Sequence, residues 1–272
     1  MKKILCLFGV LTLALASCSK DDDDNDSGNG TNAILVKTVT VTYPEYPSEN
    51  SESAVTYNGN KLVSVSGKDS RTDYTYEGNL IVKQIDYEIE DGKDSKSYEV
   101  SYRYTNGKLA ESIYSENFTS QYPFGQYKGR SVYTYNPDGT VKRDSYSTDY
   151  NTGIETKSPY IALLTLVNGN ITKSVVTYTT PSSHYVYTID YEYDTKNTPL
   201  KNVLGYSLLL GEDESSSNNI VKRTKFSVYG SEVLEPYVNK TTYEYNANGY
   251  PTKKIEYRED GVTVEAITEY TY

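Results

Sequence analysis

Short runs in which apolar and polar residues alternate recur from Ala54 to the end of the chain, and turns rich in Asn, Asp and Gly separate them. Two copies are clear, VYTYNPDGTVKRDSY (Val132 to Tyr146) and TYEYNANGYPTKKIEY (Thr242 to Tyr257). Alternation places successive side chains on opposite faces of a strand, and Asn–Gly or Asp–Gly turns join antiparallel strands. The pattern predicts an all-β fold, a large antiparallel sheet of successive hairpins. Gly139 and Gly249 are expected to take the left-handed turn conformation.

The stretch IDYEYD shows how the two faces of this sheet differ. Ile189, Tyr191 and Tyr193 share one face, and three carboxylates share the other (Asp190, Glu192 and Asp194). One side of the sheet is therefore predicted to be aromatic and the other charged. Lysines in neighbouring strands favour cross-strand ion pairs over a metal site for these carboxylates; they are Lys173, Lys240 and Lys254.

One segment departs from the alternation. PLKNVLGYSLLLG (Pro199 to Gly211) has apolar residues at spacings close to those of a helix. The pattern indicates at most one short helix, which would cap the sheet or plug one end. No change in composition divides the β region, so residues 34–272 are predicted to form a single β domain.

The start of the chain predicts export and lipidation. Lys2 and Lys3 precede the apolar run ILCLFGVLTLALA, which is too short for a permanent membrane helix. The stretch LASC resembles the lipobox of bacterial lipoproteins, which implies a signal peptide over residues 1–17 and acyl chains on Cys18. The alternative is an ordinary secretory signal with an incidental cysteine. Because Cys6 leaves with the signal, the mature chain has one cysteine and no internal disulfide.

Residues 18–33 read as the lipidated cysteine and a flexible acidic tether. The run Ser19, Lys20, Asp21, Asp22, Asp23 and Asp24 lacks the alternating acids and final glutamate of an EF-hand. Contiguous carboxylates repel one another and extend the chain. CSKDDDD also resembles the lipoprotein export signal of the Bacteroidetes, which implies transfer to the outer face of the outer membrane. The expected location is the outer membrane, lipid-anchored and facing the exterior.

The repeats carry a further resemblance. The YxYNxxG units resemble the YD repeats of Rhs-type proteins, although Thr140 and Tyr250 stand where an arginine usually follows the turn glycine. Together with YDTKNTPLKN and the leader, they are more similar to a Bacteroidetes lipoprotein family whose domain of unknown function has a porin-like fold. That resemblance implies a rolled or closed, barrel-like sheet and no established activity. Charged residues alternate through most strands, which favours a soluble barrel tethered by its lipid over a membrane-spanning one.

Composition limits the chemistry that the chain can perform. Without Lys2 and Lys3, 25 basic and 37 acidic residues give a net charge of −12, which argues against nucleic acid as a partner. His184 is the single histidine, so no ordinary zinc site is expected. Its neighbours Ser182 and Ser183 give little support for a triad, because triad partners meet through geometry and not through adjacency. No phosphate loop or dinucleotide motif is present, and we predict no catalytic residue, metal or cofactor.

Tyrosine is the abundant aromatic residue, with 31 copies against four phenylalanines and no tryptophan. Most of these rings are expected to build the sheet, but a rigid amphipathic ring also suits recognition. We therefore expect a non-catalytic binding module for a glycan or protein ligand, with Tyr122, Tyr127 and Tyr160 as candidates for exposure. The alternatives are a hydrolase that acts on surface polysaccharide through carboxylates, and a purely structural envelope protein.

Overall fold

The fold is taken from a computed structural model, which describes residues 33–211 and 215–272. The expected signal peptide, Cys18 and the acidic run lie outside the described residues. Seventeen strands and two 3-10 helices are present: β1 Thr38–Thr42, η1 Pro47–Glu49, β2 Ser51–Asn58, β3 Lys61–Ser66, β4 Ser70–Glu77, β5 Leu80–Glu90, β6 Lys93–Thr105, β7 Lys108–Glu116, β8 Tyr127–Tyr135, β9 Thr140–Thr148, β10 Glu155–Val167, β11 Asn170–Thr180, β12 Ser183–Tyr193, η2 Tyr206–Leu208, β13 Ile220–Tyr229, β14 Glu232–Val233, β15 Tyr237–Tyr245, β16 Pro251–Tyr257 and β17 Val264–Thr271.

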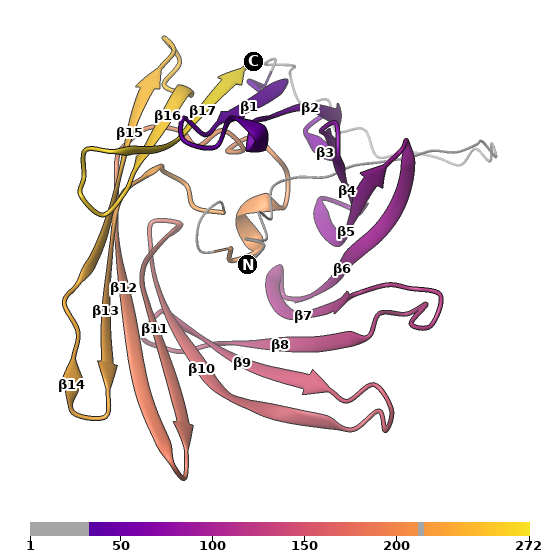
Figure 1. The fold of residues 1–272 in the computed structure, drawn as a ribbon, viewed down its shortest axis with the longest axis vertical. Helices are drawn as coiled ribbons and strands as arrows, with labels where there is room; N and C mark the ends of the chain where they lie inside the picture. Colours follow the sequence, from indigo (N-terminus) through magenta and orange to yellow (C-terminus); the bar gives the residue numbers. More distant parts are fainter. Residues whose placement is uncertain (1–32, 212–214) are drawn as a thin grey trace.

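Sixteen of these strands form a closed antiparallel barrel, which confirms the prediction of an all-β, barrel-like sheet. Each strand pairs with the next along the chain, and β17 pairs with β1 through a register that runs from Thr38–Thr271 to Thr42–Ile267. The two-residue strand β14 is an appendage of β13, which also pairs directly with β15. Figure 1 shows the strands following one another around a ring, with the first and last strands adjacent. No helix of the described residues is long and apolar enough to cross a membrane.

Six turns that contain a glycine with positive φ lie at one end of the barrel. Gly139 and Gly249 have φ of 85° and 76°, as the sequence predicts, because only glycine takes this conformation without a steric penalty. The turns join β2 to β3, β4 to β5, β6 to β7, β8 to β9, β10 to β11 and β15 to β16. The barrel is thus a ring of hairpins, and each hairpin must still be joined to the next.

Tyrosine hydroxyls join the hairpins near the turns. Between β5 and β6 the last backbone pair is Lys83–Ser101, and beyond it Tyr104 Oη donates to the Ile81 carbonyl at 2.7 Å. Five other tyrosines bond the backbone of the preceding strand at equivalent positions. They pair as Tyr76 with Leu62, Tyr135 with Leu109, Tyr193 with Ile171, Tyr243 with Ile220 and Tyr272 with Pro251. The phenols of Tyr193, Tyr243 and Tyr272 donate to a carbonyl, whereas those of Tyr76 and Tyr135 accept from a backbone N–H.

These six tyrosine clamps share one geometry. In each, the tyrosine comes three residues after the last ladder residue of its strand, and the bonded backbone group comes two residues before the last ladder residue opposite. Neighbouring hairpins therefore separate toward the turns, and a phenol spans the gap where a backbone bond no longer reaches. Burial raises the pKa of five of these phenols, so they stay protonated; they are Tyr76, Tyr104, Tyr135, Tyr243 and Tyr272. The clamps explain why a Tyr-x-Tyr unit recurs in six of the strands.

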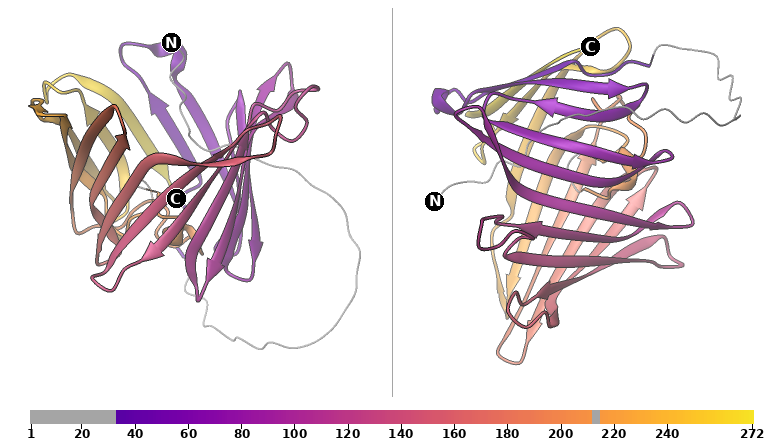
Figure 2. Two further views of the ribbon diagram at one scale, coloured as in Figure 1. Left: turned by 90° about the horizontal axis from the view of Figure 1, so that it is seen from below. Right: turned by 90° about the vertical axis from the view of Figure 1, so that its right-hand side faces the viewer.

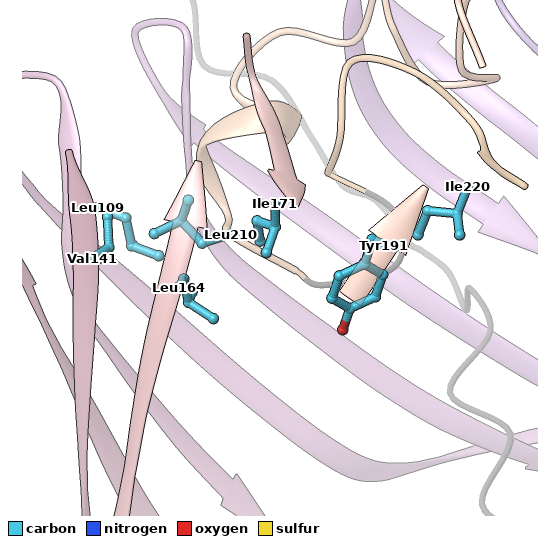
Figure 3. Close-up of a cluster of buried hydrophobic side chains, with 7 residues drawn as sticks. All are labelled: Leu109, Val141, Leu164, Ile171, Tyr191, Leu210 and Ile220. Atoms are coloured by element: carbon cyan, nitrogen blue, oxygen red, sulfur yellow. The ribbon is translucent and has the colours of Figure 1, made fainter. Parts of the chain in front are cut away.

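The segment 194–219, without 212–214, lies inside the ring near the turns (Figures 1 and 2). Val203 and Tyr206 pack on Leu62, Val65 and Ile81 of the wall. Leu210 packs in a second cluster, which Figure 3 shows, with Leu109, Val141, Leu164, Ile171, Tyr191 and Ile220. This interior segment fills one end of the barrel, as the sequence suggests. Its described residues form turns and the short η2 helix. The helix does not extend further toward the N-terminus, because Gly205 just before η2 has a φ of 75°.

Two of the three carboxylates of IDYEYD lie on the face opposite its aromatic residues, as predicted, whereas Asp194, one residue beyond β12, accepts hydrogen bonds from Tyr245 and Asn219. Tyr191 and Tyr193 pack inside, whereas Lys173 pairs with Asp190 across the outer face at 3.2 Å and Lys222 pairs with Glu192 at 2.7 Å. Lys254 instead pairs with Glu256 of its own strand at 3.0 Å. Lys240 has no carboxylate within ion-pair distance among the described residues.

Candidate functional site

Four tyrosines line the inner wall near the end of the barrel opposite the turns. They occupy directly paired positions on four consecutive strands: Tyr160 of β10, Tyr178 of β11, Tyr185 of β12 and Tyr229 of β13. Paired residues share a face, and Tyr185 alternates with Tyr187, Ile189 and Tyr191 toward the buried core. Register alone therefore places all four rings in one row, which we call the tyrosine row.

Ring contacts connect the row along its length. Tyr178 and Tyr185 are stacked with centroids 4.8 Å apart, and Tyr160 lies 4.8 Å from Tyr178 at a tilt of 55°. Tyr229 lies 5.4 Å from Tyr185. Three strand spacings make the row about 14 Å long. The end members are exposed, Tyr160 by 41% and Tyr229 by 51%, so the row offers ring surface to a ligand at both ends.

Polar groups accompany the rings. Tyr185 Oη donates to Tyr160 Oη at 2.5 Å, and this hydrogen bond, together with burial, raises the pKa of Tyr185. The Tyr185 phenol therefore stays neutral, and the hydroxyls of the row can donate and accept hydrogen bonds. On the next inner position, Lys225 Nζ lies 4.7 Å from the ring centre of Tyr187, within cation–π range. The chemistry is that of a polar aromatic binding surface.

A small cavity of about 90 Å³ lies deeper, between the interior segment and the wall. Its lining is mostly aliphatic, with Val36, Val39 and Val65 from the wall and Leu200 from the interior segment. Lys254 also lines it, but this lysine pairs with Glu256. Benzene-binding cavities in protein cores are about 150 Å³, so this space is small for an organic ligand.

The structure separates the candidates that the sequence singles out. Tyr160 belongs to the tyrosine row, whereas Tyr127 is 54% exposed near the β7–β8 loop and Tyr122 forms an edge-to-face pair with Tyr150 at 4.8 Å. The row's other members, Tyr178, Tyr185 and Tyr229, were not singled out. Aligning the β11 and β12 segments about the turn at Pro181–Ser182 would have paired Tyr178 with Tyr185.

His184 and its serine neighbours do not form a catalytic arrangement. Ser183 pairs with Thr180 and His184 with Thr179, so the two side chains point to opposite faces of β12. His184 Nδ1 lies 3.0 Å from the hydroxyl of Thr179 on the exposed surface. Within residues 33–211 and 215–272, no group of three or more His, Cys, Asp or Glu side chains is placed to hold a metal ion.

Comparison with known proteins gives the fold. No protein-family model and no curated protein matches the chain. The crystal structure of a porin-like protein from Bacteroides vulgatus aligns with 88% of this chain and 99% of its own, with a TM-score of 0.60 and 15% sequence identity. A porin-like protein from Bacteroides uniformis covers 87% and 97%, with a TM-score of 0.43 and 10% identity. The first alignment spans nearly both whole chains, so this protein has a porin-like fold.

Proposed function

We propose that the protein is a lipid-anchored barrel of the outer cell surface that binds a glycan through its tyrosine row and performs no catalysis. The observation that carries this proposal is the row itself, four tyrosines in register inside the barrel with its ends exposed. Rings with two rotatable bonds lose little entropy on binding, and their hydroxyls meet the hydroxyls of a sugar.

The outer face supports a tether in place of a transmembrane barrel. A lipid-facing wall needs an uninterrupted apolar band, and a charged side chain at the bilayer midplane is costly. Here ion pairs lie along many outer strands, such as Arg103–Glu111 at 2.8 Å, Arg130–Glu111 at 2.9 Å and Lys142–Asp144 at 2.7 Å. Attachment then falls to acyl chains on Cys18, with Ser19 to Asp24 as the export signal.

A glycan array probed with the full-length, detergent-solubilised protein tests the binding. We expect Tyr160→Ala and Tyr229→Ala each to weaken binding at least tenfold. Tyr46→Ala is the matched control, because Tyr46 is 54% exposed in the β1–β2 loop, away from the row. Binding that survives both row substitutions would remove the row from the function. Release of shorter products from a bound polymer would favour the hydrolase instead.

Surface display is tested separately on intact cells. Protease added outside should degrade the protein, and antibody should label cells that have not been permeabilised. Replacing Asp21 to Asp24 by alanine should leave the protein lipidated but protected from the protease. If the native protein resists external protease while a known surface protein is cut, the proposed location is wrong.

A further inference from the structure

The outer face of β10 to β14 differs from the rest of the wall. Two adjacent rows of outward positions there hold no charged residue. One row runs Ile161, Thr177, Val186, Val228 and Val233, and the other runs Leu163, Val175, Thr188 and Phe226. We call these nine residues the outer apolar patch. Leu163 is 37% exposed, Phe226 39% and Val233 73%, so large apolar side chains face solvent.

Ion pairs border the patch and make it distinct. Toward the turns, the next outward row contains Lys173 and Asp190, whose side chains lie 3.2 Å apart. On the β9 side, Lys142 and Asp144 pair at 2.7 Å, opposite Leu163 and Ile161. Lys157 also pairs with Asp144, at 2.8 Å, so each of these border carboxylates is paired with lysine. The surface is therefore suited to an apolar, uncharged partner.

The size of the patch helps to identify the partner. Strands 4.8 Å apart and same-face residues two positions apart give each side chain roughly 30 Å², so nine positions cover on the order of 300 Å². Two such patches face to face would bury on the order of 600 Å², well below the roughly 1,200 Å² of a stable protein interface. The patch alone therefore buries too little area to hold a second copy of the chain in a stable dimer.

We propose that the outer apolar patch rests on the membrane to which the protein is tethered, so that the barrel lies with β10 to β14 against the lipid. This inference rests on the lipid anchor of the proposed function. Residue 33 lies fifteen positions after Cys18, and this stretch reaches about 50 Å when extended. The longest strands have 13 residues and span about 43 Å, so the tether is long enough for any side of the barrel to reach the bilayer.

The anchor also explains why so small a patch suffices. A tethered surface meets the bilayer at high effective concentration, so contact needs far less apolar area than association from solution. Because the patch is uncharged, the contact should be insensitive to salt.

Depth-dependent fluorescence quenching tests the contact. The acylated full chain is placed in phosphatidylcholine vesicles that contain brominated lipid, and a dye is attached to Thr188→Cys at the centre of the patch. Cys18 is blocked by its acyl chain, so the new thiol is the single labelling site of the mature chain. Thr75→Cys is the matched control, because Thr75 alternates with the inward Tyr74 and Tyr76 and so lies on the outer face of β4.

We expect the dye at position 188 to be quenched at least threefold more than the dye at position 75, at low and at high salt. Adding Phe226→Glu should abolish the difference, whereas Val262→Glu, at a 78%-exposed position of the β16–β17 turn, should leave it unchanged. Equal quenching at both sites on acylated protein overturns the inference. If the protein forms a dimer in detergent and Phe226→Glu dissociates it, the partner of the patch is a second copy of the chain and not the membrane. If mass spectrometry finds no acyl chain on Cys18, the lipid anchor of the proposed function is wrong.

Discussion

Removing the hydroxyl of one tyrosine clamp should measurably weaken the barrel. In Tyr104→Phe the ring keeps its packing, but the Ile81 carbonyl loses the donor that lies 2.7 Å away. The β5–β6 ladder ends at Lys83–Ser101, so no backbone group of β6 takes the donor's place. A partly buried acceptor left without its hydrogen bond costs about 1–2 kcal/mol. For a domain of this size, that lowers Tm by about 3–6 °C.

Equilibrium unfolding in urea, followed by circular dichroism, measures this loss as a lower midpoint at unchanged slope. Tyr127→Phe is the matched control, since Tyr127 is 54% exposed and its substitution should change the free energy of unfolding by less than about 0.5 kcal/mol. Tyr193→Phe and Tyr272→Phe should resemble Tyr104→Phe, because they remove equivalent bonds at 2.7 and 2.8 Å. If all three variants are as stable as Tyr127→Phe, the clamps contribute nothing and tyrosine recurs for packing alone.

Two further predictions concern backbone and charge. Gly139→Ala should cost about 1 kcal/mol for its φ of 85° alone, because an added Cβ has no atom within 4 Å. Gly205→Ala should cost at least 2 kcal/mol in the same thermal melts, because its Cβ would also lie 2.7 Å from the Asn79 carbonyl oxygen; equal costs would contradict the close packing of the interior segment. Burial, aided by Asp94 and Asp86 and opposed by Arg71, raises the pKa of Asp73 to about 6. The folded state then binds a proton more tightly than the unfolded state, so stability should fall as pH rises from about 4 to about 6. Asp73→Asn should weaken that dependence, which Asp86 shares because burial also raises its pKa, and should add up to about 2 kcal/mol at pH 7 once solvent screening of this partly exposed group is allowed for; identical pH profiles for the two proteins would refute the assignment.

The sequence predicts the hairpins well because both of their signals are local. Alternation and glycine turns depend on neighbours in the chain, and Gly139 and Gly249 behave as expected. The clamps could not be derived in the same way, since the bond from Tyr104 to Ile81 joins two different hairpins. Closure of the sheet came from family resemblance, because no local pattern states that β17 meets β1. The helix-like spacing of Pro199 to Gly211 gives one short helix, η2, and the segment packs on the wall through the buried Val203, Tyr206 and Leu210.

Of the four residues of the tyrosine row, the sequence alone singled out one. Tyr160 attracted notice because it lies in an irregular stretch, and β10 indeed has a register shift between Lys157 and Ile161. Tyr178 and Tyr185 lie in regular alternation and look like the many tyrosines that build the wall. What distinguishes them is their distance from the interior segment, which a strand's own sequence does not record.

The seam between β1 and β17 has a consequence for how the chain reaches its native state. Thr38 and Thr271, whose hydroxyls lie 2.6 Å apart across this seam, are separated by 233 positions. Closing a loop of that length costs roughly 3 kcal/mol more entropy than closing a ten-residue hairpin. The other seams can form as the chain emerges, but this one must wait for the last strand, and until then the edges of β1 and the growing sheet remain open to other chains. If the chain is exported unfolded, aggregation is therefore avoided best when each copy stays apart from the others until residue 271 can pair.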